Sequence, residues 1–248
     1  MTFTLRAWRR ELKSAHMDTV LLLKVGKFYE MYNMDADVGV QVLGLTYMTG
    51  GAASDSQAHC GFPEMAYAKN ARALAQKGFR VARVEQTETP EAMQARTGKK
   101  SGLVRREVCQ RLSPGTCVDG ELLNDHVPKY LLTVVENPAV RDESASFGVC
   151  IADCTTGTFE VGFIQDDTYL SRMATLLAQL QPAEVLFERN KLSPVMHKLL
   201  RREAPAALKS ELGEGAFWGA RQTISELGGG EGGEGAKYFG ESRSEWPV

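Results

Sequence analysis

The sequence predicts a mixed α/β fold with two domains, each a sheet flanked by helices. Short runs rich in β-branched and aromatic residues alternate with amphipathic helical patterns. A polar bridge at residues 119–128 interrupts this order, after which it restarts. The 248 residues also suit two domains better than one. We therefore expect domains over residues 1–125 and 126–248.

End signals locate the elements of the first domain. Gly44 and Gly78 occupy the positions that follow helix ends, where a left-handed backbone favours glycine. Thr89 followed by Pro90 is typical of a helix start. The predicted elements, in order, are a helix at 4–15, a strand at 19–25, an extended stretch at 27–32, a helix at 36–43 capped by Asp35, a strand at 45–48, a helix at 64–77, a strand at 79–86, a helix from residue 90 and a strand at 103–112.

The second domain begins with strand patterns and ends in a glycine-rich segment. Residues 147–164 predict two strands around a Thr-Thr-Gly turn, which is a hairpin signal. Asp166 or Asp167 caps the next helix, and Pro182 follows its end. The predicted elements are a strand at 129–136, the hairpin, a helix at 168–180, a strand at 183–188, a helix from Ser193-Pro194 to about 203, a helix at 216–227 and a flexible segment at 228–235.

The amino-acid composition is that of an ordinary soluble globular protein. The apolar fraction is 43% and the charged fraction 24%. No apolar run approaches the roughly 20 residues that span a bilayer, and no signal peptide is visible. The five cysteines form no CxxC pair, which favours a reduced, intracellular protein. Residues 1–125 hold 17 Lys and Arg against 14 Asp and Glu, a mildly basic balance that is weak support for a polyanion partner.

The stretch "KVGKFYEMY", residues 24–32, is unusual after a buried strand. Side chains alternate along a strand, so Phe28 and Glu30 share one face while Tyr29 and Met31 share the other. The odd positions are the more apolar, so Tyr29 and Met31 are expected in the core. If the strand runs regularly through Gly26, Lys24 joins Phe28 and Glu30; a bulge there reverses the earlier faces and keeps that pair together.

An exposed Phe beside a Glu has a possible role on DNA. The ring can stack on a base or enter a base step as a wedge that kinks the duplex. The carboxyl can accept from a base N–H, or donate once protonated. The alternative is structural: a Phe at a strand end belongs to the core, and a Glu two residues later is solvated.

Longer motifs add a family resemblance. "KVGKFYEMYNMDADVGVQVLGL", "HCGFPEMAYAKNARALAQKGFRVARVEQTETPEAMQAR" and "VRREVCQRLSPGT" resemble the mismatch-recognition domain of MutS proteins, most of all the large subunit of the eukaryotic MutSα type. "KYLLTVVE", "FGVCIADCTTGTFEVGFI" and "PAEVLFERNKLS" resemble the connector domain of that family. The resemblance covers roughly residues 5–227, with several motifs in the right order.

The resemblance implies a role for each residue of the stretch. Phe28 stacks on a mispaired base in kinked DNA, and Glu30 hydrogen-bonds that base. We add Lys24 and Lys27 as neighbours of the DNA backbone. A mismatched step bends at lower cost than a paired one, so deformability is read as affinity. The fold implied is a mixed sheet flanked by helices, followed by an RNase H-like α/β connector.

The resemblance also implies partners: mismatched double-stranded DNA and a second MutS homologue in a MutSα-type heterodimer within the nucleus. ATP and Mg²⁺ are expected only for a full-length protein, because this chain has no GxxxxGK[ST] loop and "TGKKSG" at 97–102 follows no strand. We therefore expect no cofactor, no catalytic residue and no metal ligand here, and no membrane partner. The loop that contains residues 49–59 looks longer than in the family.

Two alternatives remain open. One is a structure-selective nuclease of RNase H-like type built around Asp153, which needs further carboxylates for its metals. The residue instead suits a turn before Thr155, Thr156 and Gly157. The other is a docking module for repair proteins through the acidic second half, which holds 12 Lys and Arg against 17 Asp and Glu. His59 is expected to be a loop residue.

Overall fold

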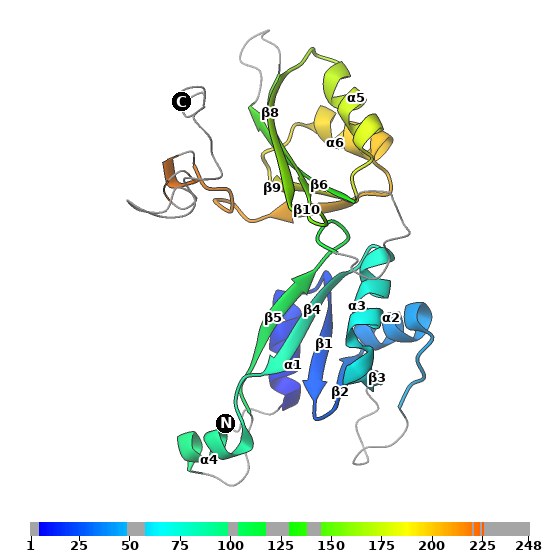
Figure 1. Cartoon of the computed structure of the whole chain (residues 1–248), viewed down its shortest axis with the longest axis vertical. Coiled ribbons are helices and arrows are strands. Elements are labelled where there is room, and N and C mark those ends of the chain that lie inside the picture. Colours follow the sequence, from blue (N-terminus) through cyan, green and yellow to red (C-terminus); the bar gives the residue numbers. More distant parts are fainter. Residues whose placement is uncertain are drawn as a thin grey trace.

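The computed structural model describes residues 5–48, 58–98, 104–117, 129–137 and 145–219, together with 221–223 and 225. Figure 1 shows two α/β domains, one above the other along the longest axis. Each contains a five-stranded sheet, in the order β3-β2-β1-β4-β5 and β10-β9-β6-β7-β8. The mixed fold class is confirmed. The boundary predicted at residue 125 lies outside the described residues.

The first domain is a mixed sheet with helices on both faces. Strands β1 and β4 are parallel, and the other neighbours are antiparallel. The elements are α1 (Leu5–Ala15), β1 (Thr19–Val25), β2 (Phe28–Tyr32), α2 (Met34–Leu43), β3 (His59–Pro63), the 3-10 turn η1 (Glu64–Ala66), α3 (Tyr67–Gln76), β4 (Arg80–Gln86), α4 (Pro90–Thr97) and β5 (Arg106–Leu112).

Alternation along the central strands divides the apolar residues between two cores. Leu22, Tyr29 and Met31 are buried on the face that α2 and α3 cover. Leu21 and Leu23 are buried on the other face, where residues of α1 pack against them. Burying this apolar surface on both sides makes the central strands a rigid support, because cores pack as densely as organic crystals.

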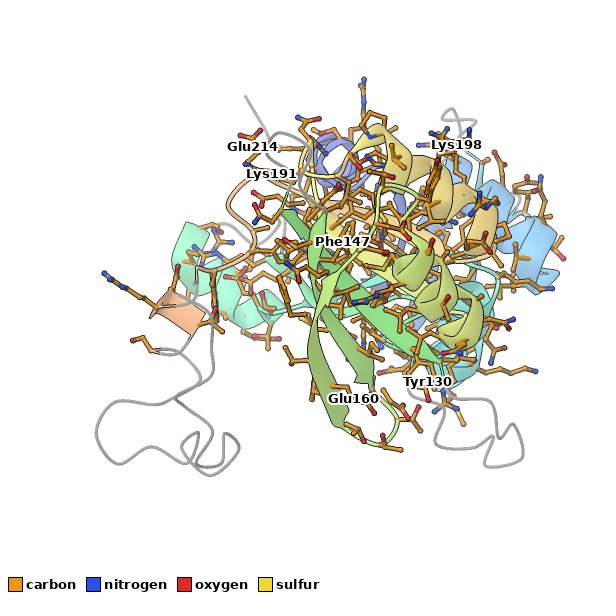
Figure 2. All side chains as sticks on the ribbon, turned by 90° about the horizontal axis from the view of Figure 1, so that it is seen from above. Tyr130, Phe147, Glu160, Lys191, Lys198 and Glu214 are labelled. Carbon is orange, nitrogen blue, oxygen red and sulfur yellow. The ribbon has the colours of Figure 1, made fainter. Side chains whose placement is uncertain are left out.

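In the second domain the helices cover one face of the sheet. Strands β6, β9 and β10 are parallel, while β6, β7 and β8 form an antiparallel meander. Phe147 is fully buried against α5 and α6, and Glu160 lies on the β7–β8 hairpin (Figure 2). The elements are β6 (Tyr130–Asn137), β7 (Ser146–Asp153), β8 (Thr158–Gln165), α5 (Ser171–Leu180), β9 (Glu184–Glu188), α6 (Pro194–Glu203) and β10 (Leu208–Leu212).

Local end signals were correct where the capping group is close in sequence. The Thr89 hydroxyl accepts from Ala92 N, and the Ser193 hydroxyl accepts from Met196 N. Gly44 and Gly78 take left-handed conformations after α2 and α3. These predictions are confirmed. They could be made from the sequence because each depends only on neighbouring residues.

Asp35 is not the N-cap of α2, which is Asn33. Its buried carboxylate instead accepts from Leu21 N and from Lys13, and so links β1, α1 and α2. Leu170 precedes α5 in place of either aspartate. The Asp166 carboxylate still accepts from Met173 N at 2.8 Å. It therefore provides a partner for a free backbone N–H in the first turn of α5, although it lies several residues before the helix.

Three strand predictions were wrong. Residues 45–48 form no strand, although Met48 N donates to His59 O. His59 belongs to β3, a strand that was mistaken for part of a loop. Strand β10 was missed altogether; it is short, and its parallel partner β9 is distant in sequence. The predicted helix at 216–227 begins too early: residues 216–219 are not helical, residues 221–223 and 225 are, and Trp218 is half exposed.

A buried polar network joins the two domains where Figure 1 shows them meeting. The guanidinium of Arg80, at the start of β4, donates to the Ser210 hydroxyl at 2.7 Å. Ser210 donates to the buried carboxylate of Glu184, which also accepts from Gly115 N at 3.2 Å. Within the described residues, no helix has the length and apolarity that crossing a membrane requires.

Candidate nucleic-acid interface

The site is built on the β1–β2 hairpin. Its two-residue turn consists of Gly26 and Lys27, because Val25 pairs with Phe28. Gly26 takes φ +57°, a left-handed conformation that suits glycine in a tight hairpin turn. The Lys27 carbonyl accepts from Glu64 N at 2.9 Å, which fixes the turn against the next segment. The turn lies at the end of the first sheet that is remote from the second domain (Figure 1).

Phe28 lies outside the core at the first position of β2. The residue is 41% exposed, whereas Tyr29 and Met31 are fully buried. The predicted division of β2 into an inner and an outer face is therefore confirmed. Because β2 pairs with β1 on one side and β3 on the other, the exposed ring is carried by a backbone held from both sides.

The predicted neighbour Lys24 is on the wrong face. The chain reverses at Gly26 instead of running on, so Lys24 pairs with Tyr29 and lies on the inner side. Its ammonium is 2.6 Å from the Glu64 carboxylate and 4.8 Å from the centre of the Tyr29 ring. The hydrogen bond and charge of Lys24 lower the pKa of Glu64. The contact of Lys24 with DNA stays a prediction, and its buried, paired ammonium does not support it.

Lys27 has the opposite environment. It is exposed in the turn, one residue before Phe28. If a base stacked on the Phe28 ring, the Lys27 ammonium would be available to a neighbouring phosphate of the DNA backbone. Its contact with the DNA backbone stays a prediction.

Glu30 lies two residues from Phe28 on the same face and is partly buried. The Tyr32 hydroxyl donates a short hydrogen bond to its Oε2 atom. Its cross-strand neighbour is Gly61, where a Cβ atom would come 3.3 Å from Glu30 Cγ and 2.8 Å from the Tyr29 carbonyl. Glycine at this place leaves room for the Glu30 side chain.

Below the hairpin a second polar cluster surrounds the hydroxyl of Tyr29. This hydroxyl donates to Glu85 and accepts from Arg83 Nε at 2.7 Å. The Arg83 guanidinium also lies 4.5 Å from the centre of the Tyr67 ring. Burial and the hydrogen bond to Glu85 raise the pKa of Tyr29. The cluster therefore satisfies the polar end of a core tyrosine.

Other candidate residues take structural roles. Asp153 accepts from the backbone N–H groups of Thr155 and Thr156 at 2.8 and 3.4 Å, as predicted for a turn residue. Desolvation raises the pKa of the Asp153 carboxyl, but these hydrogen bonds outweigh it, so the pKa is lowered. Among the described residues no group of three or more His, Cys, Asp or Glu side chains is placed to hold a metal ion.

Sequence reasoning missed the surroundings of Glu30. Arg9 of α1 and His59 of β3 both contact Tyr32. Alternation alone puts Tyr32 on the same face as Glu30, so that pair was visible in the sequence. The contacts with α1 and β3 were not, because they join residues 23 to 27 positions apart. Residues 49–57, whose role was left open, are outside the described part.

Comparison with known proteins identifies the family. The family model of MutS domain I matches residues 5–121, and that of MutS domain II matches residues 129–224. This chain belongs to the MutS family. It is 42% identical over 236 residues to the DNA mismatch repair protein Msh6 of Gallus gallus and 40% identical over 238 residues to that of Homo sapiens. Msh6 of Arabidopsis thaliana is 38% identical over 229 residues.

These matches cover 90%, 90% and 88% of the chain, and 17% of the length of each relative. The resemblance drawn from the motifs is thus confirmed, and the relatives are of the Msh6 type. The chain corresponds to about one sixth of a relative, so any activity of a longer protein is a separate question.

Proposed function

We propose that this chain recognises mismatched DNA within a MutS-family repair protein of the Msh6 type. Phe28 enters the weakened base step, and Glu30 hydrogen-bonds the mispaired base. The observation that carries the proposal is the exposed ring of Phe28 on a strand whose other face is sealed in the core. An aromatic ring held outside on a rigid hairpin can replace a lost base-stacking partner.

The energetics favour a sensor of deformability. A paired step resists unstacking more than a mismatched one, so the same wedge reaches the mismatched step at lower cost. The wedge needs a support that does not yield, and β2 supplies it through pairing on both sides and the buried side chains of Tyr29 and Met31. Lys27, exposed beside the ring, offsets the charge of a nearby phosphate.

Substitution of Phe28 tests this function. Fluorescence anisotropy would compare a duplex with one G·T mismatch and its fully paired equivalent, at low salt because few phosphate contacts are available. Stacking on one base contributes about 1–3 kcal/mol, so Phe28→Ala should lower the preference for the mismatch about 5- to 150-fold. Phe159→Ala is the matched control, since this ring is 68% exposed on β8. Equal preference in the wild type and Phe28→Ala would contradict the proposal.

Glu30 is expected to act on base choice. Glu30→Ala should change the ranking of different mismatches more than the total affinity, because the carboxyl contacts a base edge and not the backbone. The same titration over several mismatches measures this ranking. A uniform loss over all of them would show that Glu30 does not read the base.

The wider role is proposed from the relatives. A longer protein would pair with a second MutS homologue, act in the nucleus and use ATP with Mg²⁺ elsewhere in its length. The segment at 97–102 does not support a phosphate loop at its described residues, because Gly98 closes helix α4 whereas a phosphate loop opens a helix after a strand.

Docking of repair partners is a second candidate function. Strand β8 is at the edge of the second sheet, and Phe159, Val161 and Phe163 are exposed along one of its faces. An exposed edge strand with apolar side chains is typical of a surface that another chain covers. Loss of partner capture by Phe163→Ser, with mismatch preference unchanged, would support docking.

The nuclease alternative predicts metal-dependent cleavage that Asp153→Asn abolishes, and we expect no product with magnesium or manganese.

A further inference from the structure

The partly buried side chain of Tyr32 is held by contacts with two other elements. Its ring contacts two other groups: the Arg9 guanidinium is 3.7 Å from the ring centre, and the centre of the His59 ring lies 5.7 Å away, with the two ring planes inclined by 15°. These groups come from α1 and β3, so three elements meet at this ring. Such contacts restrict the ring to one orientation.

The hydroxyl of this fixed ring donates to Glu30 Oε2. Burial and the hydrogen bond to Glu30 raise the pKa of Tyr32, so the phenol keeps its proton at neutral pH and remains a donor. A glutamate side chain otherwise samples several rotamers, and ordering it on binding costs affinity. In this structure one oxygen of the Glu30 carboxylate is already held by this hydrogen bond without DNA.

We propose that Tyr32 is a positioning residue that holds the Glu30 carboxylate for the mispaired base. This inference rests on the proposed function and deepens it. One carboxylate oxygen is engaged by Tyr32, and the other is presented to the base edge. Arg9 and His59 act one step further away, because they fix the ring that fixes the carboxylate.

The arrangement makes helix α1 part of mismatch recognition. Arg9 does not lie on the hairpin, yet it stacks on the tyrosine that orients Glu30. Loss of the tyrosine hydroxyl should therefore affect base choice without affecting the wedge, because Phe28 is held by strand pairing and not by this hydrogen bond.

Tyr32→Phe is the direct test, since it removes the hydroxyl and keeps the ring that contacts Arg9 and His59. We expect the relative affinities for different mismatches to change about 3- to 10-fold, the effect of ordering one flexible side chain on binding. Tyr47→Phe is the matched control: it also removes a hydroxyl that donates to a carboxylate, that of Asp37 at 2.7 Å. The control should leave the ranking of mismatches unchanged.

A double-mutant cycle separates positioning from a general structural role. If Tyr32 acts through Glu30, then Tyr32→Phe should have no further effect in a Glu30→Ala background. An equal loss in both backgrounds would overturn the proposal. An unchanged ranking of mismatches in Tyr32→Phe, with the mismatch preference lost in Phe28→Ala, would overturn the positioning role and leave the proposed function standing.

A measurement without DNA tests the positioning role separately from mismatch binding. NMR relaxation of the Glu30 side-chain methylene carbons in the free chain should show increased motion in Tyr32→Phe and no change in Tyr47→Phe. Unchanged motion in Tyr32→Phe would overturn the proposal. Circular dichroism melting of each variant confirms that the fold is retained.

Discussion

Ser210→Ala should weaken the link between the two domains. Ser210 accepts from the Arg80 guanidinium of the first domain at 2.7 Å and donates to Glu184 within the second. The hydroxyl is therefore a direct polar link between β4 and the second sheet. Its residue is 2% exposed and Glu184 is 3% exposed, so water cannot replace the lost partner.

The magnitude follows from these contacts. A hydrogen bond from a charged donor contributes about 1.5–3 kcal/mol, and a buried acceptor that lacks a donor costs about 1–3 kcal/mol. Glu184 keeps the bond from Gly115 N, and Arg80 keeps its pair with Asp18, so part of each loss is recovered. We expect the free energy of unfolding to fall by about 2 kcal/mol.

Urea unfolding measures the total, and hydrogen exchange followed by mass spectrometry locates it. Exchange should increase in peptides from β4 as well as from β9 and β10, because the link stabilises both domains. The control Asp18→Asn removes the negative charge that pairs with Arg80 within its own domain and should leave exchange in β9 and β10 unchanged. A change in unfolding free energy below about 0.5 kcal/mol, or faster exchange confined to β9 and β10, would refute the reasoning.

Two further predictions concern the first domain. Gly39→Ala should lower the free energy of unfolding of this domain in urea by about 1–2 kcal/mol. The new Cβ would come 2.5 Å from Met31 Cε and 2.8 Å from Cys60 Sγ, and this crowding outweighs the gain in helix propensity. Higher stability of the variant would contradict this packing. Hydrogen bonding from Arg96 lowers the pKa of Glu88 from 4.5 to about 2. This depressed value means that the pair stabilises α4 fully above pH 4.5 and is lost as pH falls through about 2. Exchange of α4 amides should show that dependence, and Glu88→Gln should abolish it; equal profiles would count against it.

Short-range information explains most of the predictions that were correct. Alternation placed Tyr29 and Met31 in the core and Phe28 outside, because a strand sends successive side chains to opposite faces whatever its partners are. The caps at Thr89 and Ser193 need only a hydroxyl and the N–H three residues later. The order of the motifs along the chain indicated the family, and the family models confirm it.

Apart from the face of Lys24, the main errors involve partners distant in sequence. Strand β3 forms because it pairs with β2, and β10 forms because it pairs with β9. Asp35 looked like a cap, but its carboxylate bonds Lys13 and Leu21 from earlier elements. No local pattern contains these contacts, since loop closure and burial decide them only when the chain is folded.

By itself the sequence determined the two α/β domains, the family, and the pairing of Phe28 with Glu30 on one face of a strand. Those features depend on periodicity and motif order, which are properties of neighbouring residues. Only the tertiary structure decided that the chain reverses at Gly26, which sends Lys24 to the inner face and leaves Lys27 outside. It also decided that Tyr32 holds Glu30, because the supporting groups come from α1 and β3, which meet β2 only after folding.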